Sequence, residues 1–254
     1  MRLPAALSTD DDSAVLDLLR RYYRRPPDGE HGFTGSAFDT WDPSGTRATS
    51  ADVFTADDVV AVSLLSVDLS GRAAHELLVR RRDEFAQMLR AVGPDRDLVD
   101  EGEPIAKESP LSQLFHALDA LDGVGPTRAT KLIARKRPRL RPVWDGVVAR
   151  HLGVGSSYVE PLRQRLREAD RALHRRLVRL GEEAELVGVS PLRVFDVVTW
   201  LEARESLRGA TTVDEGATPR AAERDEHLLP EKAQEAARRD GQDVTAPTSR
   251  TAPR

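Results

Sequence analysis

Two glycines, one residue apart, separate two helical patterns in the middle of the chain, in the stretch LDGVGPTRAT (121–130). Ser109 and Pro110 open the first pattern as N-cap and first helical residue, and apolar residues follow at helical spacing. Gly123 and Gly125 permit a sharp turn because neither carries a Cβ atom, and the next proline fixes φ for a second helix. The stretch therefore predicts two helices joined by a tight loop.

Helical periodicity also dominates the rest of the chain. Thr55 and Asp58 form a capping-box pattern before an apolar run. Further helices are expected over residues 8–25, 72–92, 145–152, 157–180 and 190–202, and one short strand over 35–41. We therefore expect a mostly α fold in which a helical domain spans residues 51–204 and a turn-rich appendage with one helix spans residues 1–50. Residues 205–254 contain no aromatic residue and only isolated leucines, which predicts a disordered polar tail.

Composition excludes several kinds of site. The 254 residues contain no cysteine, which excludes disulfides, thiolate zinc sites and cysteine-held iron–sulfur clusters. His75, His116 and His151 are scattered without partners at ligand spacing, so neither a metal nor another cofactor is expected. No apolar run approaches the roughly 18 residues of a membrane span, and the N-terminus lacks a signal sequence. We therefore expect a cytoplasmic protein without a membrane partner.

The second helix of the pair carries basic residues at regular spacing. Arg128, Lys131 and Arg135 recur at i, i+3 and i+7, which predicts a basic face. Between residues 123 and 150 there are eight Lys or Arg residues and one acidic residue, although the formal net charge of the chain is −4. A basic patch within an acidic chain is typical of a surface that binds nucleic acid.

The loop between the two helices is a candidate phosphate site. Backbone amides at a helix N-terminus attract anions, so Gly123, Val124 and Gly125, together with the basic face, predict contact with the DNA backbone. Such contacts carry no sequence preference and lose affinity steeply with salt. The alternatives are a turn that needs glycine only to bend, and a solvated basic surface at Arg135, Lys136, Arg137, Arg139 and Arg141.

This pattern resembles the helix-hairpin-helix DNA-binding motif, in which an apolar residue, Gly, an apolar residue and Gly are followed by a small residue four positions on, here Ala129. The stretch WDGVVARHLG widens the resemblance to the helix-hairpin-helix DNA glycosylases of the endonuclease III and adenine glycosylase type. Those enzymes place an Asp at the start of the next helix, as Asp145 stands here. The similarity covers residues 55–152. The chain also resembles an uncharacterised group of actinobacterial proteins.

The resemblance implies double-stranded DNA as the partner, a role in DNA repair, and Asp145 as a catalytic carboxylate that acts on a flipped-out nucleotide. Thr127 stands where the lyase-type enzymes carry a Schiff-base lysine, which argues against lyase chemistry. Three functions therefore stay open: a DNA-binding protein that contacts phosphates, a monofunctional DNA glycosylase, and a non-catalytic helical scaffold. Asp is also a favoured N-cap residue, so Asp145 has a purely structural alternative.

Overall fold

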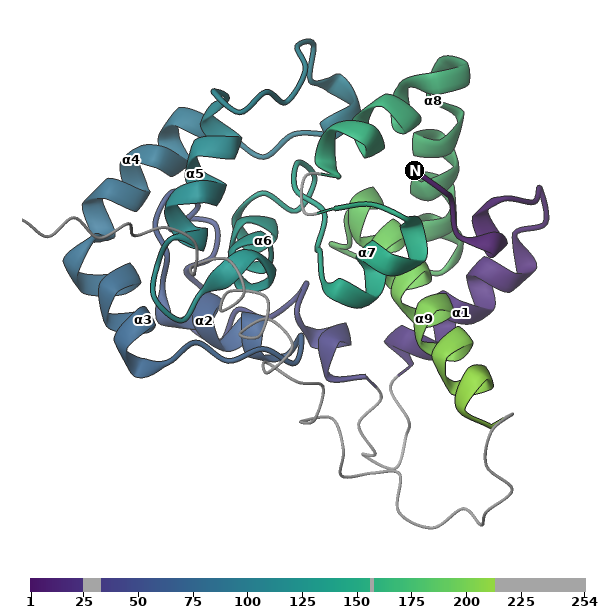
Figure 1. Ribbon diagram of the computed structural model, residues 1–254, viewed down its shortest axis with the longest axis horizontal. Coiled ribbons are helices and arrows are strands. Elements are labelled where there is room, and N and C mark those ends of the chain that lie inside the picture. Colours follow the sequence, from purple (N-terminus) through teal and green to yellow (C-terminus); the bar gives the residue numbers. More distant parts are fainter. Residues whose placement is uncertain (25–32, 156–157, 213–254) are drawn as a thin grey trace, which may run out of the picture. The chain divides into compact units, whose positions relative to one another are not determined.

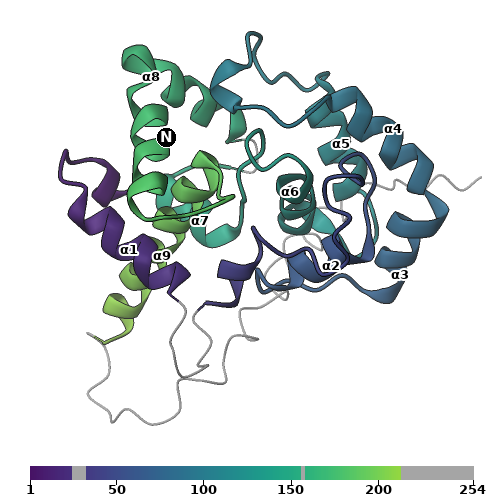
Figure 2. The same cartoon turned by 180° about the vertical axis from the view of Figure 1, so that it is seen from behind.

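The computed structural model describes residues 1–24, 33–155 and 158–212, and this part of the chain is helical without a β-strand (Figures 1 and 2). The expectation of a mostly α fold is therefore confirmed. The α-helices are α1 (Ser13–Tyr23), α2 (Ala56–Ser63), α3 (Gly71–His75), α4 (Arg82–Val92), α5 (Pro110–Asp119), α6 (Gly125–Lys136), α7 (Gly146–Leu152), α8 (Val159–Glu183) and α9 (Pro191–Thr212). Short 3-10 helices span Ala5–Leu7, Thr34–Ala37 and Leu98–Asp100, and a π-helical segment spans Glu76–Arg80.

Several expected elements differ from the observed ones. The strand expected over 35–41 is wrong, because this segment begins with a 3-10 helix whose Gly35 lies against the hydroxyl of Tyr22. The single helix expected over 72–92 is divided into α3, the π-helical segment and α4. The last helix extends to Thr212, beyond the expected end at 202, and the rest of the expected tail, 213–254, lies outside the described residues.

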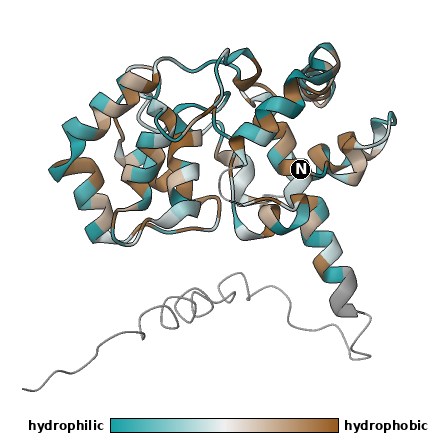
Figure 3. Cartoon of the chain, turned by 45° about the horizontal axis from the view of Figure 1, so that its top comes forward, coloured by the Kyte–Doolittle hydropathy of each residue, from teal (hydrophilic) through white to brown (hydrophobic). Residues whose placement is uncertain are grey.

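The helices pack in two groups, which both views separate (Figures 1 and 2). One group contains α2 to α6, with α6 packed on both α2 and α5. The other contains α1, α7, α8 and α9, in which α9 contacts the three other helices. Along the helices, brown hydrophobic segments alternate with teal hydrophilic ones (Figure 3), as expected where one side of a helix is buried. Burial of the hydrophobic residues is the main driving force for the packing.

One buried carboxylate joins α2 to α6. Oδ2 of Asp58 accepts the backbone N–H of Thr55 at 2.8 Å, which completes the predicted capping box of α2. The same carboxylate lies 2.5 Å from Nζ of Lys136 and 3.3 Å from Nε of Arg135. All three charged side chains are buried. A carboxylate that would be very unfavourable alone in the interior is thus compensated by two cations and a backbone amide.

A second buried pair ties α9 to the first fifty residues. Nε of Arg193 donates to Asp39 at 3.1 Å, and its Nη2 donates to the Tyr22 hydroxyl at 2.7 Å. Arg193 and Asp39 are both buried. Buried residues of α1, among them Leu19, belong to the same hydrophobic cluster as α9. The segment expected as an appendage therefore supplies part of the core around α9.

The Asp58 cluster makes a direct stability prediction. Asp58→Asn keeps the shape of the side chain but leaves Arg135 and Lys136 without a counter-charge, and breaking a buried ion pair costs about 3–5 kcal/mol. We expect the free energy of unfolding, measured by urea denaturation, to fall by about that amount. Asp83→Asn, an exposed carboxylate in the first turn of α4, is the matched control and is expected to change stability by less than about 0.5 kcal/mol. Equal stability of the two variants would contradict the prediction.

Candidate functional site

The loop between α5 and α6 is formed by Ala120–Val124. Gly123 and Gly125 have φ values of +81° and +63°, in the left-handed region that favours glycine. A Cβ atom on Gly123 would lie 3.2 Å from Oγ of Ser70, whereas one on Gly125 would meet nothing within 4 Å. Gly123 therefore allows the loop to approach the N-terminus of α3, and Gly125 leaves open space in front of α6. The side chain of Val124 is fully buried, and its backbone N–H donates to the backbone oxygen of Leu121 at 3.0 Å. The expected contact of the Val124 amide with a phosphate is therefore not available in this conformation.

The N-terminus of α6 is open. No side chain caps it, because Val124 stands at the N-cap position. Pro126 and Thr127 follow in the first turn and are partly exposed. Beside the loop, Asp122 and Arg72 form an ion pair at 3.7 Å in which both side chains are about four-fifths exposed. Exposed pairs of this kind contribute little to stability, so both groups can exchange partners readily.

The basic side chains of α6 face α2 and the segment that follows it. Nε of Arg128 donates to the backbone oxygen of Asp68 at 2.6 Å. Nζ of Lys131 donates to the backbone oxygen of Leu65 at 2.7 Å. Arg135 continues the row toward Asp58 and also donates to the backbone oxygens of Phe38 and Trp41. The i, i+3, i+7 row therefore holds α2 and residues 64–70 against α6.

The expected exposed basic face is therefore wrong for two of its three members. Lys131 is 4% exposed and Arg135 is 2% exposed, so neither can reach a DNA backbone in this conformation. Arg128 is partly exposed. The wider basic cluster follows the same pattern, because Lys136, Arg137 and Arg141 are buried, and Arg139 is paired with Asp97. The spacing showed that the residues share a face, but it could not show which way that face points.

Asp145 is the N-cap of α7. Its Oδ1 atom accepts the backbone N–H groups of Val147 and Val148, each at 2.9 Å. The structural role weighed for this residue is thus present. Within the described part of the chain, Oδ2 makes no hydrogen bond, and the side chain is partly exposed. Burial lowers the pKa of the neighbouring Lys131 to about 8, although the negative charge of Asp145 opposes this shift.

A buried polar group consists of Tyr158, at the start of α8, and Asp196 on α9, and both side chains bind the backbone of Val143, two residues before Asp145. The backbone N–H of Val143 donates to Oδ2 of Asp196 at 2.7 Å, and the hydroxyl of Tyr158 donates to the backbone oxygen of Val143 at 2.7 Å. Burial raises the pKa of Asp196 to about 8, an effect that the hydrogen bond from Val143 and the charge of Arg193 oppose. The guanidinium of Arg141 lies over the ring of Phe115, 4.8 Å from its centroid.

Sequence reasoning missed this polar group. Asp196 lies in the stretch PLRVFDVVTWL, which is mostly apolar and in which Phe195 and Val197 flank the aspartate. An acidic residue within a mostly apolar helix indicates a buried carboxyl group, because such a helix is largely enclosed by protein. Arg141 gave no comparable signal, since it stands in the same basic run as exposed Arg139.

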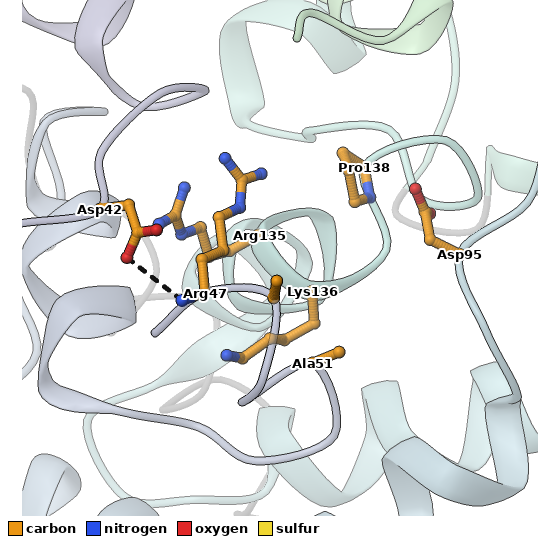
Figure 4. Close-up of a pocket in the computed structure, with 8 residues that line it drawn as sticks. Asp42, Arg47, Ala51, Asp95, Arg135, Lys136 and Pro138 are labelled. Carbon is orange, nitrogen blue, oxygen red and sulfur yellow. Dashed lines mark hydrogen bonds between the residues drawn. The ribbon is translucent and has the colours of Figure 1, made fainter. Parts of the chain in front are cut away.

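A pocket of about 380 Å³ lies at the other end of α6 (Figure 4). Its lining residues are Asp42, Arg47, Ala48, Ala51, Asp95, Arg135, Lys136 and Pro138. Arg135 and Lys136 are already bound to Asp58 and to backbone oxygens. Asp42 accepts the backbone N–H of Arg47 at 3.1 Å. Because its buried cations are satisfied by the protein, the pocket does not offer them to a ligand.

Two further properties concern metals and membranes. Among residues 1–24, 33–155 and 158–212, no group of three or more His, Cys, Asp or Glu side chains is arranged to hold a metal ion. In the same residues, no helix has the length and apolar character needed to cross a membrane.

Most of the chain matches one known protein family. The profile of a family of unknown function, DUF6308, matches residues 15–203. The chain belongs to the DUF6308 family. The DUF6308 match begins within α1 and ends within α9, so it includes the glycine loop, Asp145 and the polar group around Asp196. No curated protein and no solved structure matches the chain significantly.

The raised pKa of Asp196 predicts a pH dependence of stability. An unperturbed Asp has a pKa near 3.9, so between about pH 4 and pH 8 the folded state holds a proton that the unfolded state has lost. The contribution of this group to the free energy of unfolding therefore falls as pH rises through that window. Asp196→Asn keeps an oxygen that can accept the N–H of Val143 and carries no charge.

We expect the Asp196→Asn variant to lose most of this decline and to have a higher Tm than the wild type at pH 8. Thermal unfolding from pH 5 to pH 8 measures the effect. Asp83→Asn, whose carboxylate is exposed, is the control and should keep the wild-type pH profile. Parallel profiles for the wild type and Asp196→Asn would show that Asp196 does not titrate in this range.

Proposed function

We propose that the protein binds double-stranded DNA through a helix-hairpin-helix formed by α5, the glycine loop and α6, and that it does so in DNA repair. The contact is with backbone phosphates and has little sequence preference. The observation that carries the proposal is the uncapped, partly exposed N-terminus of α6, whose first residue, Gly125, is the second of two glycines in the left-handed region. Amides in this arrangement attract an anion through both hydrogen bonding and the helix dipole.

Few basic side chains support this contact. Lys131 and Arg135 are buried, which leaves Arg128 on α6 and Arg72 beside the loop as the nearby cations with exposed surface. A site of this size neutralises one or two phosphates. We therefore expect weak binding whose log–log salt slope is about −1 to −2, well below the slope that the whole basic row would give.

Thr127 offers a sharp test, because it lies in the first turn of α6 and is partly exposed. Thr127→Glu places a carboxylate where the phosphate would bind, while a negative charge at a helix N-terminus stabilises the helix by about 0.3–1 kcal/mol. We expect affinity for a duplex oligonucleotide, measured by fluorescence anisotropy at low salt, to fall at least tenfold without any loss of Tm.

Two variants at the same position complete the test. Thr127→Gln matches the size of the glutamate without its charge and should bind within a few-fold of the wild type. Thr127→Lys adds a cation and should bind more tightly. Wild-type affinity in Thr127→Glu would overturn the proposal. Absence of duplex binding by the wild-type protein at low salt would also overturn it and would favour a non-catalytic scaffold.

A second candidate is a monofunctional DNA N-glycosylase that uses Asp145. The observation that favours it is the geometry of this carboxylate, in which two amides fix Oδ1 while Oδ2 has no hydrogen bond within the described residues. A fixed carboxylate with one free oxygen can stabilise a sugar cation or position a water molecule. The first turn of α6 carries Thr127, so the lysine of lyase-type enzymes is not supplied at that position.

Asp145→Asn isolates the chemistry from the structure, because an asparagine oxygen can still accept the two capping bonds. The assay incubates duplexes that contain damaged or mismatched bases with the protein and then applies alkali, which cleaves the strand wherever a base has been released. We expect cleavage by the wild type and a loss of at least 100-fold in Asp145→Asn at unchanged Tm. Base release that survives the substitution, or no release from any duplex, would exclude this function.

A further inference from the structure

The connection between α6 and α7 carries an unusual charge. Arg141 is 3% exposed and lies at the junction of the two helix groups, between Phe115 of α5 and the polar group of Tyr158 and Asp196. Within the described residues it forms no ion pair and its guanidinium has no hydrogen-bond acceptor, and its Nε atom is completely enclosed. The ring of Phe115 is the contact that offsets part of its charge, through a cation–π interaction.

The nearest acidic group does not neutralise this arginine. Asp196 and Arg141 form no ion pair within the described residues, and the carboxyl group of Asp196 accepts the N–H of Val143. Burial raises the pKa of Asp196 to about 8, so at neutral pH this group is largely protonated. Burial also lowers the pKa of Arg141 to about 10, which leaves the guanidinium charged at neutral pH. The junction therefore holds a buried positive charge without an internal counter-charge.

Other buried cations of the chain have acceptors. Arg135 and Lys136 share Asp58, and Arg193 is paired with Asp39. A buried charge without a partner is strongly unfavourable, and a buried donor that no protein group satisfies indicates an acceptor from outside the chain. The planar fork of a guanidinium matches the paired oxygens of a carboxylate or a phosphate.

We propose that Arg141 binds a small oxyanion, a carboxylate or phosphate group, at the junction of the two helix groups. The ligand is small because the arginine is almost entirely enclosed, which excludes a duplex DNA backbone. The bound oxygens accept hydrogen bonds from the N–H groups at the edge of the guanidinium, whose face remains over the ring of Phe115. Bound in this way, the anion links the α6–α7 connection to both helix groups and stabilises their association.

The test uses the full chain with inorganic phosphate and, separately, acetate as probes, each against sodium chloride at equal ionic strength. We expect a saturable rise in Tm with at least one probe, together with a matching binding isotherm by calorimetry. Arg141→Met replaces the charge with an apolar chain of similar length. Because an apolar side chain is tolerated where an unpaired charge was buried, we expect this variant to fold and to lose the response.

Arg141→Lys keeps the charge without the planar fork and should weaken binding at least tenfold. Arg90→Met, on the exposed side of α4, is the matched control and should respond as the wild type does. No saturable response to either probe, or the same response in Arg141→Met, would overturn the proposal. Duplex binding should be unchanged in Arg141→Met, so this proposal and the DNA-binding proposal can fail separately.

Discussion

The arrangement of α2, α5 and α6 depends on the basic row of α6. Arg128 and Lys131 bind the backbone oxygens of Asp68 and Leu65, and Arg135 binds the carboxylate of Asp58. Helix α6 is therefore enclosed on two sides, by apolar contacts with α5 and by polar contacts with α2 and residues 64–70. Because the row donates to backbone oxygens and one carboxylate of α2 and the segment that leads to α3, it holds the start of α6 close to that segment.

This use of the basic row changes how the glycine loop is understood. In the sequence, loop and row form one basic surface. In the folded chain, as far as the structure describes it, the charged side chains with exposed surface beside the loop are Arg128 and the pair of Arg72 with Asp122. The proposed phosphate contact would therefore depend mainly on backbone geometry and the helix dipole, and less on the total charge of a partner.

The local signals in the sequence predicted much of the fold. Ser109 accepts the N–H of Ser112 as an N-cap, Thr55 and Asp58 form their capping box, and Asp145 caps α7, because capping depends on residues within one turn. Burial of the polar residues was not predictable in the same way. Lys131 is buried where it donates to the backbone oxygen of Leu65, and Arg193 is buried where it donates to the carboxylate of Asp39. Such contacts depend on tertiary packing, which helical periodicity does not encode.

The buried cations of the two helix groups differ in whether the described residues supply an acceptor for them. Arg135 and Arg193 donate to acceptors within the chain and thereby join elements that are distant in the sequence. Arg141 joins nothing through hydrogen bonds of its guanidinium within the described residues, yet it occupies the junction where α5, α8 and α9 meet the α6–α7 connection. A fold that needed only bulk at this point would be more stable with an apolar side chain there. The oxyanion proposed above would supply the acceptor that this guanidinium lacks among the described residues.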